Sequence, residues 1–142
     1  MKFNNETLFK LILVVVGGFI IFAGINVGFG GIRSLGWQVP SDFLTVTNEA
    51  NFTIQDNHVR FLGGAFGVAG IFLLLAVSDL NKYQTALRLV FVLMFVGGLS
   101  RLTSPQPNVV LDGSVITSFL AEIILAPILF FWLGRLMAQE ER

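Results

Sequence analysis

"DNHVRFLGGAFGVAGIFLLLAV", residues 56–77, decides the fold of this chain. An acid, an amide, the only histidine and an arginine stand before a long apolar run that carries no further charge. About 20 helical residues are needed to cross roughly 30 Å of hydrocarbon, and this run is long enough. The stretch therefore predicts a membrane-spanning helix with a group of polar residues at its amino-terminal end.

The composition of the whole chain indicates the same class of protein. Apolar residues make up 54% of the 142 residues, charged residues only 13%, and the mean hydropathy is +0.78, whereas about a quarter of the residues of a soluble domain carry charge. The absence of cysteine excludes disulfides, thiolate nucleophiles, iron–sulfur clusters and cysteine zinc sites. A formal net charge of zero and the lack of a basic run argue against nucleic-acid binding. We expect no metal and no cofactor.

Four apolar stretches are long enough to span a bilayer. We therefore predict an all-α fold, an integral membrane four-helix bundle that forms one domain over residues 1–142, with helices at about 8–29, 59–78, 85–102 and 114–136. The first stretch is too long for a signal peptide and lacks an A-x-A cleavage site, so we expect it to be retained as a helix.

Basic residues near the ends of the spans predict the orientation, because they prefer the cytoplasm. One side collects Lys2, Lys10, Lys82, Arg88, Arg135 and Arg142, and the other Arg33, Arg60 and Arg101. This bias places both termini in the cytoplasm, and we expect the membrane to be a bacterial inner membrane. The connection over residues 30–57 then lies on the non-cytoplasmic side. It is too long for a turn, and it either lies along the headgroups or folds over the helices as a lid.

Glycines predict where helices approach one another. Within lipid, small residues four apart place one helix face close to a neighbouring backbone. We expect this role for Gly24, Gly28, Gly63, Gly67, Gly97 and Gly98. Packing within the chain is favoured over a homodimer face, which stays open as an alternative.

Glu122 is the polar residue that most needs a partner. It lies eight residues after Ser114, about 12 Å along a helix, where an acidic group costs about 2.5–3.5 kcal/mol. Arg101 and Arg60 enter from the same side, and Arg101 is the better candidate because Gly97 lies one turn away. The pair either fixes helix register or belongs to a polar pocket that a kink at Pro127 widens.

The predicted topology gathers further polar residues on the non-cytoplasmic side. Together they form a candidate ligand-binding cluster or buried ion pair that consists of Asn26, Arg33, His58, Arg60, Arg101 and Glu122. Asp56 or Asn57 is expected to cap the second helix. A histidine beside a helix start is typically a capping or headgroup-facing residue, although His58 and Glu122 are also candidate catalytic residues for acid/base chemistry.

Short motifs in three helices resemble a known family. "HVRFLGG", "GGLSRLTS" and the glutamate inside the fourth helix are similar to the small bacterial membrane proteins of the domain of unknown function 4345 family, distantly DoxX-like. The resemblance runs from "AGINVGFGG" to the end of the fourth helix. It implies a four-helix membrane protein without an established activity. The matching positions are Arg60, Gly63, Gly64, Arg101, Ser104 and Glu122.

Three functions are compatible with these residues. The leading hypothesis is a non-enzymatic inner-membrane protein whose polar cluster binds a membrane lipid or another hydrophobic small molecule, or docks a partner membrane protein or a second copy, because arginines suit phosphate and carboxylate groups. The second is a small intramembrane isomerase that uses Glu122 and His58 for proton transfer. The third is a purely structural assembly protein. Whether the chain is an enzyme stays open.

Overall fold

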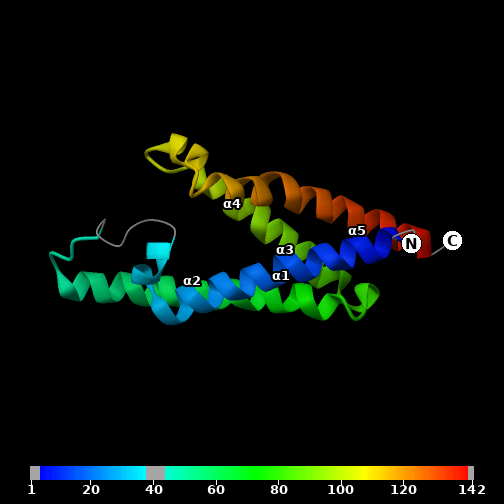
Figure 1. Ribbon diagram of the computed structural model, residues 1–142, viewed down its shortest axis with the longest axis horizontal. Coiled ribbons are helices and arrows are strands. Elements are labelled where there is room, and N and C mark those ends of the chain that lie inside the picture. Colours follow the sequence, from blue (N-terminus) through cyan, green and yellow to red (C-terminus); the bar gives the residue numbers. More distant parts are fainter. Residues whose placement is uncertain (1–3, 38–43, 141–142) are drawn as a thin grey trace. The chain divides into compact units, whose positions relative to one another are not determined.

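The computed structural model describes residues 4–37 and 44–140, without the side chains of residues 35–37 and 140. Within these described ranges, four helical segments are long and apolar enough to cross a membrane, which confirms the all-α fold with four spans (Figure 1). They are α1 (Asn5–Gly30), α2 (Glu49–Ala76), α3 (Leu80–Arg101) and a fourth span over Ile116–Gln139. Lys2, Arg142 and residues 38–43 of the long connection lie outside the described residues.

Helix α2 begins ten residues before the predicted start at residue 59. The side-chain oxygen of Asn48 accepts a hydrogen bond from the backbone N–H of Asn51 at 3.0 Å, so Asn48 rather than Asp56 or Asn57 caps the helix. With 28 residues, α2 is about 42 Å long, well above the roughly 30 Å of hydrocarbon. The prediction was wrong because hydropathy marks where a helix leaves the membrane, whereas a polar helix can continue in water.

The structure describes parts of the connections between the four spans. A 3-10 helix, η1 (Ile32–Trp37), follows α1 after Gly31. Helix α3 begins at Leu80, five residues before the predicted start, because the Asp79 carboxylate accepts a hydrogen bond from the N–H of Lys82 at 2.9 Å. A second 3-10 helix, η3 (Pro107–Leu111), lies in the connection to the fourth span.

The fourth span is interrupted by a wide turn. It consists of α4 (Ile116–Leu120), the π-helical turn η4 (Ala121–Leu125) and α5 (Ala126–Glu140). In η4 the N–H of Ala126 donates to the carbonyl of Ala121, five residues back. Pro127 follows directly, and its ring would clash with the carbonyl one turn earlier in an uninterrupted α-helix. The wide turn relieves this clash and places Glu122 at its second position.

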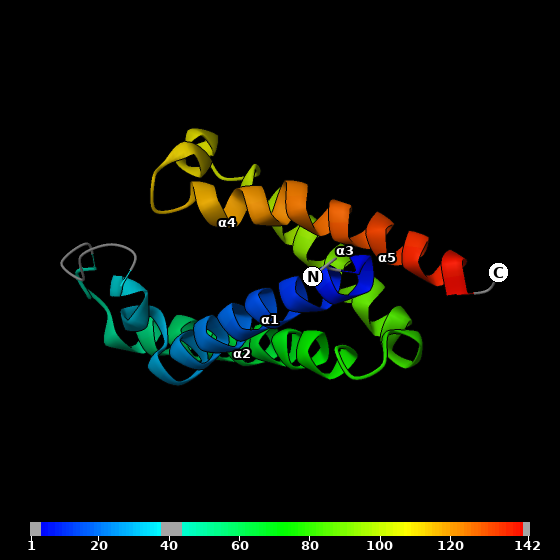
Figure 2. The ribbon, with the colours of Figure 1, turned by 45° about the vertical axis from the view of Figure 1, so that its right-hand side comes forward.

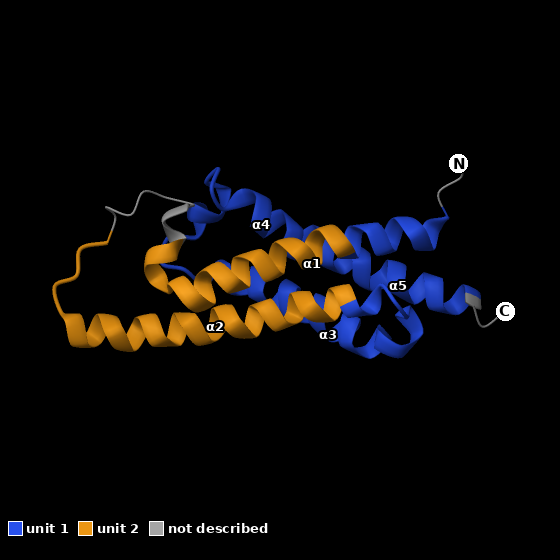
Figure 3. Ribbon diagram, turned by 60° about the horizontal axis from the view of Figure 1, so that its bottom comes forward, with its two compact units in different colours: residues 1–13, 75–142 blue, residues 14–74 orange. Residues whose placement is uncertain are grey.

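The chain divides into two compact units, and each is described by itself (Figure 3). Unit 2 covers residues 14–74, in which the later part of α1 runs beside α2 (Figures 1 and 2). Unit 1 covers residues 1–13 and 75–142, in which α3 packs against η4 and α5. The ring of Phe9 meets that of Trp132 edge-on, with centroids 5.4 Å apart. The single domain over residues 1–142 stays a prediction.

Candidate functional site

Arg101 and Glu122 form a two-pronged ion pair in unit 1. Nε of Arg101 donates to Oε2 of Glu122 at 2.6 Å, and Nη2 donates to Oε1 at 2.7 Å. This is the geometry in which guanidinium and carboxylate groups bind most strongly. The Glu122 side chain is 14% exposed and that of Arg101 38%, so the acid is shielded while the arginine reaches the surface at the end of α3.

A glycine permits this close approach of α3 and η4. A Cβ added to Gly98 would lie 2.8 Å from Cβ of Glu122 and 2.9 Å from Cδ1 of Ile123. Gly97, which supported the choice of Arg101, has open space where a Cβ would stand. The partner of Glu122 is therefore the arginine that we expected, and of the two glycines predicted to pack here, Gly98 makes the contact.

An apolar cavity of about 310 Å³ opens between α3 and α5, also in unit 1. Its lining consists of Phe91, Val92, Phe95, Ala126, Pro127, Phe130 and Phe131. Ala126 lies four residues after Glu122, so the cavity begins about one helical turn from the ion pair. Sequence reasoning missed this cavity. The available signal was Phe91 and Phe95, four residues apart on α3, together with Phe130 and Phe131, three and four residues after Pro127 in the fourth span.

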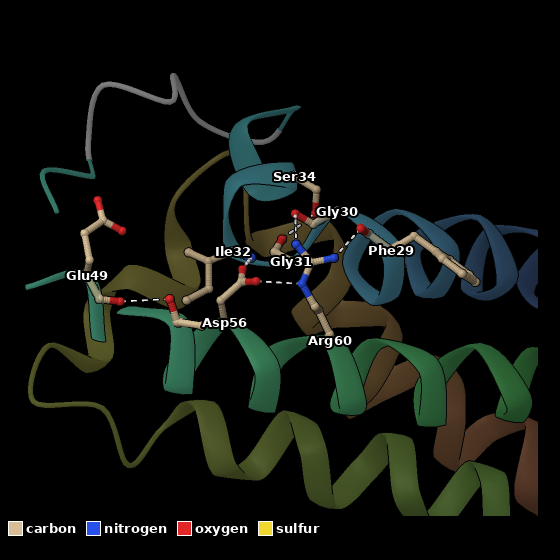
Figure 4. Close-up of polar contacts among 9 residues, drawn as sticks. Phe29, Gly30, Gly31, Ile32, Ser34, Glu49, Asp56 and Arg60 are labelled. Carbon is tan, nitrogen blue, oxygen red and sulfur yellow. Dashed lines mark hydrogen bonds and ion pairs between the residues drawn. The ribbon is translucent and has the colours of Figure 1, made fainter. Parts of the chain in front are cut away.

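In unit 2, Arg60 joins two helices through a different set of contacts (Figure 4). Its Nε donates to Oδ2 of Asp56 at 2.6 Å, its Nη1 donates to the carbonyl of Phe29, and its Nη2 donates to that of Gly30 at 3.3 Å. The carbonyls at a helix end lack partners within the helix. Arg60 therefore caps the carboxyl end of α1.

The other carboxylate oxygen of Asp56 completes this connection. Oδ1 accepts a hydrogen bond from the N–H of Ile32 at 2.8 Å, at the start of η1. Between the two contacts lies Gly31 with a φ of +68°, a conformation that residues with a side chain rarely adopt. A Cβ at Gly31 would lie 2.7 Å from Cγ of Asp56. Asp56 and Arg60 thus fix the path of the chain where it leaves α1.

A model of the family described as a domain of unknown function (DUF4345) matches residues 8–133. The chain belongs to this family. The matched range includes residues of all four spans, and it confirms the resemblance inferred from the short motifs. No curated protein and no solved structure matches the chain. This DUF4345 protein is therefore a multi-pass membrane protein whose function has to be argued from its own site.

Glycines form the contact between α1 and α2 in this DUF4345 protein. Cβ atoms on Gly24 and Gly63 would lie 2.6 Å from the backbone N of Gly67 and 2.5 Å from that of Gly28, respectively. We call these four residues, together with Gly17 and Gly70, the glycine seam; a Cβ on Gly70 would lie 2.8 Å from the carbonyl oxygen of Gly17. The seam lies within unit 2, so these glycines serve packing within one chain.

The contacts of the other predicted site residues do not assign them a chemical role. The side chain of Asn26 donates to the carbonyl of Phe22 at 2.8 Å, and the guanidinium of Arg33 lies 5.2 Å from the ring centroid of Phe52. His58 is exposed on α2. It belongs to unit 2 and Glu122 to unit 1, so their acid/base pairing stays a prediction. Over residues 4–37 and 44–140, no three histidine or acidic side chains gather as metal ligands.

Proposed function

We propose that this DUF4345 protein binds the hydrocarbon chain of a membrane amphiphile in the cavity between α3 and α5. The observation that carries the proposal is a cavity of about 310 Å³ with an entirely apolar lining in a membrane-spanning helix pair. This volume lies at the lower end of the range for small-molecule sites. Since the surroundings of the spans are themselves hydrocarbon, an apolar recess there is filled by a chain rather than by water.

The rim of the cavity is open to such a chain. Val92 and Phe131 are 47% and 67% exposed, whereas Phe91, which also lines the cavity, is 1% exposed. The cavity thus has a buried aromatic floor and an accessible edge. At one end the Arg101–Glu122 pair ties α3 to η4, and this tie holds the two elements together beside the recess.

The same contacts argue against a headgroup site built from Arg60 and Arg101. Each of these arginines already holds a carboxylate, and Arg60 also donates to two backbone carbonyls. A phosphate would have to displace Asp56 or Glu122 from a short, charge-assisted bond. The proposal therefore assigns binding to the cavity and gives the ion pairs a supporting role. A bacterial inner membrane with both termini in the cytoplasm remains part of it, supported by the distribution of lysine and arginine.

Photocrosslinking tests the proposal. The full chain is placed in nanodiscs of phosphatidylcholine that carries a diazirine on one acyl chain, and the crosslinked residues are mapped by mass spectrometry. Crosslinks should concentrate on the cavity residues of α3 and α5. Val92→Trp should fill the cavity and remove this concentration, because Val92 lines the recess.

Val96→Trp is the matched control. Val96 lies one turn further along α3, is 55% exposed and is not among the cavity residues, so the same substitution should leave the crosslinks in place. Labelling spread evenly around α3, or equal labelling in both variants, would show ordinary lipid contact and overturn the proposal. The ion pair would then be explained by a structural role alone.

A further inference from the structure

Two arginines lie just beyond the cavity, at the end opposite the Arg101–Glu122 pair. Arg88 lies three residues before Phe91 on α3, and Arg135 lies four residues after Phe131 on α5. Residues three and four apart share one helix face, so each arginine follows the row of side chains that leads into the cavity. The guanidinium of Arg88 lies 5.9 Å from the ring centroid of Phe130, which is itself part of the lining.

The positive charges at this end are not neutralised within the described part of the chain. Both arginines are exposed, and no described carboxylate lies within ion-pairing distance of either. Two described acids of unit 1 have other partners: Glu6 pairs with Lys10 at 2.6 Å, and the Asp79 carboxylate accepts the N–H of Lys82. Among the described residues, the cavity therefore has an arginine with a carboxylate partner at one end and two arginines without one at the other.

The position of Arg88 along its helix makes this charge significant. It lies eight residues after Leu80, about 12 Å into α3. A charged side chain at such a depth is costly unless it reaches the interface or finds a counter-ion. Its flexible stem can carry the guanidinium toward the headgroups. The leaflet itself provides counter-ions there, since anionic lipids attract arginines near the surface.

We propose that Arg88 and Arg135 bind the phosphate of an anionic phospholipid whose acyl chain occupies the cavity. The inference rests on the proposed function and adds the charge of the ligand and its direction in the site. Arginine suits this task because its planar fork of N–H groups matches the oxygens of a phosphate. The headgroup lies at the end of α3 near Leu80, and the chain points toward the Arg101–Glu122 pair.

The test compares two lipids that carry the same photoreactive chain. Nanodiscs contain equal amounts of phosphatidylglycerol and phosphatidylcholine, and mass spectrometry reports how much of each lipid is crosslinked to cavity residues. The wild-type protein should favour phosphatidylglycerol. Arg88→Gln should reduce this preference by roughly fivefold, the change expected for one arginine near an anionic surface, and Arg135→Gln should act in the same direction. High salt should weaken the preference.

Two further variants separate charge from fold. Arg88→Lys keeps the charge and should keep most of the preference. Arg33→Gln is the matched control, because Arg33 is also exposed and also lies over a phenylalanine, but does not lie beside the residues that line the cavity between α3 and α5. Phosphatidylcholine should still label the cavity in Arg88→Gln, which shows that the recess remains intact.

The possible results test the anionic-lipid inference and the proposed function separately. Cavity labelling without any preference for phosphatidylglycerol overturns this inference and leaves the proposed function standing. If neither lipid labels the cavity of the wild-type protein, the proposed function is overturned as well. An equal loss of preference in Arg33→Gln would show a general surface effect and contradict the site. Stronger labelling by a diazirine fatty acid than by phosphatidylglycerol would contradict the choice of a phospholipid.

Discussion

The two units pack apolar helices in opposite ways. In unit 2, α1 and α2 meet glycine against glycine, so that a Cβ on Gly24 would stand 2.6 Å from a backbone nitrogen. In unit 1, α3 and α5 meet through phenylalanines and leave a cavity of about 310 Å³. Helices in lipid associate through van der Waals contact rather than through the hydrophobic effect. The size of the facing side chains therefore decides whether a helix pair closes completely or keeps a recess.

The two arginine pairs differ in a corresponding way. Asp56 lies one turn from Arg60 on the same helix, and the rest of the guanidinium caps the end of α1. Arg101 and Glu122 stand on different elements and are joined by two hydrogen bonds. The Asp56–Arg60 pair adds to a contact between α1 and α2 that the glycine seam already makes close. The Arg101–Glu122 pair itself joins α3 to η4, so breaking it should loosen the helix pair that contains the cavity.

The glycine seam offers the strongest test of the closed contact. Gly24→Ala places a methyl group 2.9 Å from the carbonyl oxygen of Gly63 and still closer to Gly67. Both neighbours are backbone, which cannot move without separating the helices, so we expect a loss of about 2–3 kcal/mol in the free energy of unfolding. Unfolding by sodium dodecyl sulfate in mixed micelles, followed by circular dichroism, measures this loss.

Gly18→Ala is the control for that experiment. Gly18 lies on the same helix but has nothing within 4 Å of the added methyl group. Because alanine is the better helix former by about 0.5–1 kcal/mol, this variant should be as stable as the wild type or slightly more so. Equal losses in the two variants would contradict a seam that depends on close backbone contact.

The Arg101–Glu122 pair should show the next largest effect. Glu122→Leu leaves Arg101 without its carboxylate, and a lost hydrogen bond to a charged group costs about 2 kcal/mol. Adding Arg101→Leu should recover part of this loss, because it removes the unpaired cation. Glu6→Leu breaks the more exposed Lys10–Glu6 pair and should cost less than about 0.5 kcal/mol. The same unfolding assay measures all three, and a double variant less stable than Glu122→Leu would refute the pairing argument.

Features that depend on local chemistry could be predicted from the sequence. The four spans follow from apolar length, and the partner of Glu122 follows from the cost of a carboxylate in hydrocarbon. The start of α2 could not be predicted from hydropathy, because the turns from Glu49 to Asp56 are polar and helical at once. The sequence signal for this start was Asn48, a typical N-cap residue followed by a glutamate, which hydropathy alone does not detect.

The cavity could not be predicted because it depends on how two helices are rotated. A π-helical turn holds more residues than an α-helical one and so changes the direction in which later side chains point. In the fourth span this turn lies at Ala121–Leu125, directly before the residues of α5 that line the cavity. The positions of Phe130 and Phe131 around the helix thus follow from η4. From the sequence, Arg88 indicated only the orientation of the chain in the membrane. Its contact with Phe130 could not be predicted, because Phe130 lies on another helix.

The smallest expected effect lies outside the membrane, in the connection between α3 and α4. The Asp112 carboxylate accepts hydrogen bonds from the hydroxyl of Ser114 at 2.5 Å and from its backbone N–H at 2.8 Å. These bonds, the hydroxyl first, hold the pKa of Asp112 below its ordinary value of 3.8. A lowered pKa means that the contribution to stability is present above the unfolded pKa and is lost as the pH falls through the folded one.

Ser114→Ala should therefore raise the pKa of Asp112 only part of the way, because the backbone N–H remains as a donor. Carboxyl carbon shifts measured by NMR at decreasing pH report this pKa in micelles. Ser104→Ala is the control, since its hydroxyl accepts from the N–H of Gln106 in the same connection. Water competes with every one of these bonds, in contrast to the pair at Glu122, so no measurable loss in global stability should accompany the change. A pKa left unchanged by Ser114→Ala would contradict the hydroxyl as its main cause.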